Sequence, residues 1–171
     1  MSKNYKYAVG DFVTYRRVGI CKITDIVLQN FVRQGNSEYY ELNSVYDTNT
    51  KVFVPVDSKL EDEMKPMLDS SEIDKIIKDS KLVEDLWVED CKERARVFEG
   101  IVNDGDKAKM LWLIKRVSEH KAEMEEARKK VKATDTRYLA LCESIIAGDF
   151  AYSLGLAKNQ VMDYINDYLN K

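Results

Sequence analysis

The chain has 171 residues, of which 44% are hydrophobic and 33% charged, a composition typical of a globular protein with a real core. No stretch approaches the roughly 18 apolar residues that span a bilayer, and the N-terminus lacks a signal peptide's apolar run, so we expect a cytoplasmic protein. A net charge of -3 excludes a protein that coats nucleic acid by bulk attraction alone. The three cysteines are widely spaced and suggest neither a disulfide framework nor a zinc site, so we expect no metal and no cofactor.

The first third of the chain alternates short β-favouring segments with turn residues. Residues rich in β-branched and aromatic side chains occupy positions 11–15, 20–28, 38–42 and 51–56. Gly10 and Asp11 supply a turn before the first segment, and Gly19 allows the chain to bend back after it. This meander predicts a small antiparallel barrel over residues 1–60, followed by a linker over residues 61–70.

From residue 71 onwards the spacing of apolar residues changes from two to nearly four. This spacing predicts an all-helical domain over residues 71–171, and hence the α+β class for the whole chain. A first helix is expected to be capped by residues 70–72. Further helices are expected over residues 82–101, after a break at 103–106, from about residue 134 and over 158–169. Gly148 and Gly155 are expected to break up the segment that follows residue 146.

A search of the sequence for catalytic groups finds no recognisable constellation. The one histidine, His120, lies among charged residues in a predicted helix, where we expect a solvated residue and not a general base. The sequence has no Gly-rich phosphate loop, no nucleophile elbow and no metal-binding histidine pair. We therefore expect a protein that is not an enzyme.

Three other features have both a structural and a functional interpretation. Trp87 is either a core anchor or an exposed wedge, and the residues alone favour the core anchor. The segment 51–55 ends in Pro55, which favours a sheet edge able to accept a partner's strand, although the rim of a closed barrel is the simpler interpretation. A basic cluster at a helix junction forms either phosphate contacts or a solvated face: Arg128, Lys129, Lys130, Lys132 and Arg137.

In combination, several motifs resemble a known family. The motifs are Val9-Gly10-Asp11 with Val13, Tyr15 and Gly19-Ile20, then Tyr39-Tyr40 with Leu42, then Val52 with Val54-Pro55-Val56, and Trp87 at the start of the helical half. This pattern resembles the CarD/CdnL group of bacterial transcription regulators over nearly the whole chain. The helical half matches mainly through Trp87, Lys92 and the Asp104-Gly105-Asp106 break. The N-terminal part also resembles the polymerase-interacting module of the transcription-repair coupling factor.

The resemblance implies a transcription regulator with a Tudor-like barrel that docks by strand addition on the β subunit of bacterial RNA polymerase. It further implies that the helical domain lies on promoter DNA at the upstream edge of the melted bubble, where a tryptophan wedge stabilises the open complex. The residues expected to contact the polymerase are Gln29, Phe31, Lys51 and Phe53. The residues expected to contact DNA are Trp87 and Lys92 by resemblance, Arg94 and Arg96 by proximity, and Lys130, Lys132 and Arg137 from the basic cluster.

The chain departs from the family where Glu89 and Asp90 follow the tryptophan, at positions that are often basic. Two carboxylates repel phosphates, so we expect weak, sequence-independent DNA contact that depends on tethering to the polymerase. A protein adaptor whose helical half binds another protein, with Trp87 buried, is the alternative. We expect a monomer, although an exposed barrel edge would permit a swapped dimer.

Overall fold

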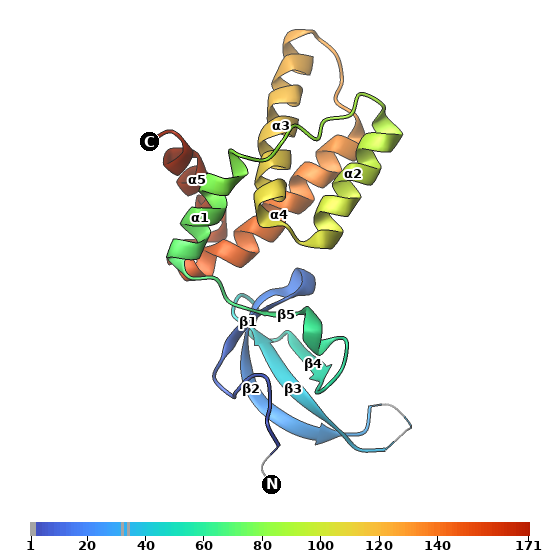
Figure 1. Ribbon diagram of the computed structural model, residues 1–171, viewed down its shortest axis with the longest axis vertical. Helices are drawn as coiled ribbons and strands as arrows, with labels where there is room; N and C mark the ends of the chain where they lie inside the picture. Colours follow the sequence, from blue (N-terminus) through green and yellow to red (C-terminus); the bar gives the residue numbers. More distant parts are fainter. Residues whose placement is uncertain (1–2, 32, 34) are drawn as a thin grey trace. The chain divides into compact units, whose positions relative to one another are not determined.

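The computed structural model describes residues 3–31, 33 and 35–171. The chain divides into two compact units, Met1–Leu68 and Asp69–Lys171. The first unit is an antiparallel sheet and the second consists of helices (Figure 1). The predicted α+β class is therefore confirmed.

The first unit contains a sheet in which neighbouring strands run antiparallel. Its strands are β1 (Phe12–Tyr15), β2 (Gly19–Gln29), β3 (Ser37–Ser44), β4 (Lys51–Pro55) and β5 (Met64–Pro66). Strands β2 and β3 form a long hairpin (Figure 1), and their register shifts between Ile23 and Asp25, where a bulge bends the ribbon. The predicted segments coincide with the first four strands because β-branched and aromatic residues fit a pleated, half-buried surface.

Buried side chains collect on one face of the curved sheet. Tyr40 is fully buried there and donates a hydrogen bond from its hydroxyl to Glu61 at 2.8 Å. Tyr5 and Tyr7 pack edge-on against the Tyr40 ring, with centroid separations of 6.4 and 6.1 Å. The remaining buried members of this core are Val13, Tyr15, Cys21, Ile23, Leu42, Val54 and Met64.

The sheet is open, which corrects the expected closed barrel. The strand order is β4-β3-β2-β1-β5, so β4 and β5 are the two edges of the described sheet. Strand β4 ends at Pro55, which has no N–H to donate to a further ladder. Because β4 pairs only with β3, its other side has no partner strand within the described sheet.

The expected linker over residues 61–70 is also wrong. Glu61 is only 6% exposed, and besides the Tyr40 hydroxyl it accepts a hydrogen bond from the backbone N–H of Asp57 at 2.7 Å. Met64 is buried, and β5 pairs with β1 in the register Tyr15↔Met64. The polar residues around Met64 conceal a strand whose partner lies far away in the sequence, so local composition could not reveal it.

The second unit consists of helices whose N-termini are capped by aspartates in three cases. Its α-helices are α1 (Ser70–Ser80), α2 (Cys91–Asp104), α3 (Lys107–Glu126), α4 (Ala133–Leu154) and α5 (Val161–Leu169), the last preceded by a 3-10 turn, Lys158–Gln160. Asp69 and Glu72 form a reciprocal capping box at α1, and Asp90 and Asp106 cap α2 and α3. Gly105 ends α2 in the left-handed region at φ 69°, which a glycine adopts without strain.

Two helix predictions are wrong. The expected helix over residues 82–101 begins only at Cys91, and residues 83–88 run as an extended connector from α1 past α3 to α2 (Figure 1). Gly148 lies inside α4 and does not interrupt it. Buried residues lie on both sides of Gly148, and their packing keeps the segment helical as far as Gly155. The helix core includes Phe98, Leu113, Cys142, Ile146 and Phe150, all with 0% exposure.

Among the residues that the structure describes, no single helix combines the length and the apolar composition needed to cross a membrane. Only the segments Ala133–Leu154 and Lys158–Leu169 together reach the required length and composition, and they are bent by 102°.

Candidate functional site

The open edge of β4 presents backbone groups to solvent. On the side facing β3, the Thr50 carbonyl accepts from the Ser44 N–H at 3.2 Å, and the Val56 N–H donates to the Glu38 carbonyl at 2.9 Å. Hydrogen-bonding direction alternates along an antiparallel strand, so Lys51 and Phe53 direct their N–H and C=O groups away from β3. This part of β4 is a template for an added strand.

An aromatic cluster lies beside this edge. Phe31 is 56% exposed, and its ring lies 5.0 Å from both the Phe53 and the Tyr39 rings, measured between centroids. Phe31 follows β2, and its ring reaches across β3 to β4. The cluster thus places apolar surface next to free backbone groups, the combination that strand addition uses for specificity and affinity.

The other two expected polymerase contacts occupy different positions. The Lys51 ammonium pairs with the Glu41 carboxylate at 2.9 Å, and this hydrogen bond lowers the pKa of Glu41 below its usual range. Gln29 is exposed at the end of β2, which is separated from β4 by β3. Gln29 is therefore near the hairpin end and not on the open edge itself.

Trp87 lies in the connector before α2, where it is partly buried. The guanidinium carbons of Arg94 and Arg116 each lie 4.3 Å from the indole centroid, and the His120 ring lies 4.6 Å away. Phe98 borders the indole at 6.4 Å. Trp87 is thus neither a fully buried core anchor nor a freely exposed wedge, because cationic and aromatic groups from two helices surround it.

Arg94 is a buried structural residue, which corrects its expected role in contacting DNA. Its side chain is 4% exposed and pairs with Asp135, whose side chain is 0% exposed. Its Nη1 donates to the backbone carbonyls of Val88 at 2.7 Å and Glu89 at 3.0 Å. The hydrogen bonds to Asp135 raise the pKa of Arg94, so it stays charged while it ties the Trp87 connector to α2 and α4.

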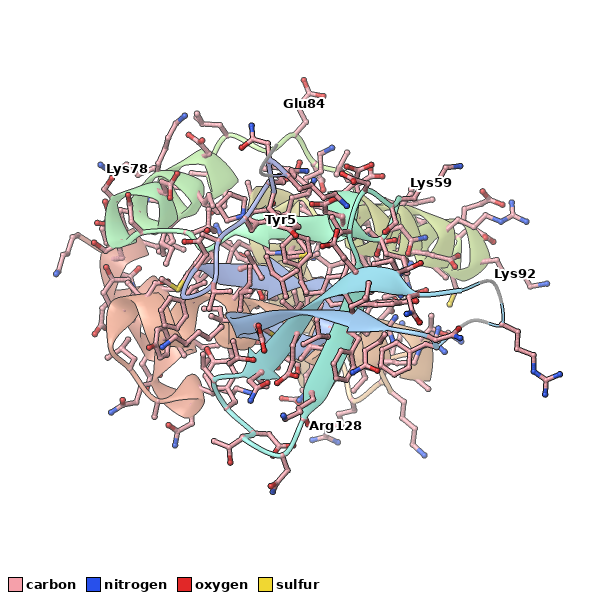
Figure 2. The ribbon with its side chains drawn as sticks, turned by 90° about the horizontal axis from the view of Figure 1, so that it is seen from below. Tyr5, Lys59, Lys78, Glu84, Lys92 and Arg128 are labelled. Atoms are coloured by element: carbon pink, nitrogen blue, oxygen red, sulfur yellow. The ribbon has the colours of Figure 1, made fainter. Side chains whose placement is uncertain are left out.

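Lys92 and Arg96 are the expected DNA contacts that α2 leaves exposed. They are four residues apart and therefore share one face of the helix. Figure 2 shows the Lys92 side chain projecting outwards from the ribbon. The Arg96 side chain is 75% exposed and bridges to Glu93 at 2.8 Å.

The basic cluster is exposed between α3 and α4. Lys130 lies in the connection, Lys132 is the N-cap residue of α4, and Arg137 lies over the Tyr138 ring at 5.1 Å. Asp135 follows Lys132 by three residues and joins this first turn of α4 to Arg94, over which the Trp87 indole stacks. One buried ion pair therefore connects the Trp87 site to the start of α4, where Lys132 and Arg137 of the basic cluster also lie.

The sequence did not identify Arg116 and His120 as members of this site. His120 was expected to be solvated, but its side chain is 15% exposed and its ring packs against Trp87. Arg116 Nη1 is buried without a hydrogen-bond acceptor among the described residues, and its nearest paired carboxylate oxygen, on Glu123, is 3.8 Å away. Arg116 and His120 are four residues apart on α3, so the sequence could show that they share one face of the helix. It could not show that this face packs against Trp87.

An open edge strand with an exposed aromatic cluster is typical of a protein-binding domain, and here a separate helical unit follows it. Residues 7–67 match the family model for the CarD-like/TRCF RID domain, which covers almost all of the sheet unit. The chain thus carries a CarD-like RNA polymerase-interacting domain, and the resemblance seen in the sequence is confirmed for this unit. The helical unit lies outside the matched residues. Comparison with curated proteins gave no significant match.

Proposed function

We propose that this protein is a bacterial transcription regulator that docks on the RNA polymerase β subunit through the β4 edge and modulates promoter open-complex stability through its helical unit. The observation that supports docking is the open β4 edge within a CarD-like/TRCF RID domain. Lys51 and Phe53 would pair their outward backbone groups with a polymerase strand. Phe31 would cover that strand with apolar surface. Such a regulator acts in the cytoplasm, needs no catalytic group and works as a monomer.

In the same proposal, the helical unit makes weak, sequence-independent contact with promoter DNA at the upstream edge of the bubble. Lys92, Arg96 and the exposed basic cluster offer charges for phosphates, while Trp87 is the apolar wedge. Docking on the polymerase raises the local concentration of this unit at the promoter, so the DNA contact needs little intrinsic affinity.

The docking step is tested by titrating the full chain against the isolated lobe of the polymerase β subunit. Phe53→Glu places a charge in the aromatic cluster, and we expect it to weaken binding by at least about 30-fold, as for a central interface residue. Lys65→Glu changes an exposed residue on β5, the opposite edge, and serves as the control with an unchanged affinity. No binding by the unaltered chain, or equal loss in both variants, would refute docking through β4.

A specific observation also favours the alternative, a protein adaptor. Exposed carboxylates flank Trp87 on both sides, and they favour a basic protein surface over DNA phosphates: Glu84, Asp85, Glu89 and Asp90. Binding of the full chain to a forked promoter DNA, in the presence and absence of polymerase, separates the two functions. The adaptor predicts no contribution of the helical unit to DNA retention in either case.

A further inference from the structure

The indole of Trp87 has its single polar atom occupied by the neighbouring carboxylate. Its Nε1–H donates to Glu89 Oε1 at 3.1 Å. The backbone N–H of Trp87 donates to Asp85 Oδ1, also at 3.1 Å. An indole N–H donates only one hydrogen bond, so no other acceptor can use it while Glu89 is bound.

Glu89 is itself held in place by its backbone. Its carbonyl accepts the hydrogen bond from Arg94, whose guanidinium is fixed by Asp135. The same guanidinium lies over the indole, so Arg94 supports both partners of the contact. Glu89 and Asp85 are thus the exposed partners of Trp87, whereas Arg94 and Asp135 are buried, and of the two exposed residues only Glu89 bonds the indole ring itself.

We propose that Glu89 is a positioning residue whose hydrogen bond acts as a latch: it holds the Trp87 indole in a closed state, packed among its neighbours. The indole becomes available to DNA only in an open state, after this hydrogen bond has broken. The proposal rests on the DNA-contact role given to Trp87 under the proposed function. Insertion of an apolar ring at a base step requires the ring to leave its local partners. Arg94 cannot follow the ring because it is buried in its ion pair, whereas the Glu89 carboxylate lies at the surface and can give up its hydrogen bond without disturbing the core. The indole is then held only by its ring contacts with Arg94, Arg116 and His120.

The hydrogen bond and the charge of Glu89 have separable effects. Glu89→Gln removes the charge but keeps a carbonyl acceptor for the indole, whereas Glu89→Ala removes both. Glu84→Ala is the matched control, because it deletes a carboxylate from the same connector, and Figure 2 shows Glu84 projecting outwards from the ribbon. A charge effect raises DNA affinity equally in Glu89→Gln and Glu89→Ala, and a latch raises it further only in Glu89→Ala.

The experiment uses full-length variants with Trp112→Phe, so that all tryptophan emission comes from Trp87. Acrylamide quenching and emission wavelength are measured without DNA, and affinity is then measured for a forked promoter DNA. We expect Glu89→Ala to raise the ratio of open to closed indole about tenfold, seen as stronger quenching and red-shifted emission. Its DNA affinity should exceed that of Glu89→Gln by up to the same factor, because the binding-competent fraction has risen.

Equal quenching in Glu89→Ala, Glu89→Gln and the Glu84→Ala control would overturn the latch. Stronger quenching in Glu89→Ala combined with no DNA binding by any variant would support the latch and refute the DNA role of Trp87. Stronger quenching with DNA affinity no higher than in Glu89→Gln would overturn the claim that the latch controls access to DNA. Thermal unfolding of each variant checks that the helical unit stays folded.

Discussion

The guanidinium of Arg94 donates two hydrogen bonds to the carboxylate of Asp135, at 2.9 and 2.7 Å, and both side chains are almost completely buried. This pair joins α2 to the first turn of α4 and supports the connector that carries Trp87. Its burial means that the cost of breaking it exceeds the net stability it contributes, because a lone charge would remain without water.

Arg94→Ala should therefore lower the free energy of unfolding of the helical unit by about 3–5 kcal/mol. The combination Arg94→Met with Asp135→Leu should recover much of that loss, since no unpaired charge is left behind. Urea denaturation, monitored through the helical circular dichroism signal, measures the free energy of unfolding of both variants. Arg96→Ala, with its 75% exposed side chain, is the control and should change stability by no more than about 0.5 kcal/mol. Equal effects of Arg94→Ala and Arg96→Ala would contradict the buried pair.

Asp149 predicts a pH-dependent stability. It is 3% exposed in α4, and burial raises its pKa above the usual 3.8, an effect that the Lys107 ammonium at 2.9 Å only partly offsets. The folded state then holds this proton at pH values where the unfolded chain has lost it. The contribution of Asp149 to stability is therefore fully present below pH 3.8 and is lost as the pH rises through the raised pKa.

The difference in unfolding free energy between the unaltered chain and Asp149→Asn should accordingly grow in favour of the unaltered chain as the pH is lowered from neutral. Within the titration window the slope should reach up to about 1.4 kcal/mol per pH unit. Asp163→Asn, at an exposed position on α5, is the control and should show no such trend. Parallel stability curves for the unaltered chain and Asp149→Asn would show that burial does not perturb this carboxyl.

The exposed cations of the basic cluster should contribute to DNA binding through phosphates alone. Lys132→Ala and Arg137→Ala should each weaken binding by a similar factor for unrelated sequences and reduce the salt slope of log K by about 1. Lys75→Ala, an exposed change on α1, is the control. A sequence-dependent loss, or an unchanged salt slope, would argue against phosphate contact.

The three cysteines should differ in reactivity. Burial raises the pKa of the Cys21 thiol to about 11 and that of Cys142 to about 12, whereas Cys91 is partly exposed at the start of α2. Because the thiolate is the reactive form, Ellman's reagent at about pH 8 should label Cys91 alone in the folded protein. All three should react after denaturation. Cys91→Ser should abolish the rapid reaction, and a rapid phase that persists would contradict the burial of the other two.

The sequence by itself determined the positions of four strands and the breaks between most helices. These features follow from local chemistry: β-favouring residues between turn residues, and Gly105 between two aspartates. It also indicated the β4 edge, because the missing N–H of Pro55 is a property of one residue.

Only the tertiary structure decided which residues meet. Strand β5 was hidden because its pairing with β1 depends on a distant segment, and the closed barrel was wrong because strand order is not a local property. Arg94 was expected to contact DNA because it lies close to Trp87 and Lys92 in the sequence, but it is buried, and Asp135 from another helix compensates its charge. The surroundings of Trp87 likewise combine a connector with α2 and α3, and contacts between separate elements arise from packing that no single stretch of sequence contains.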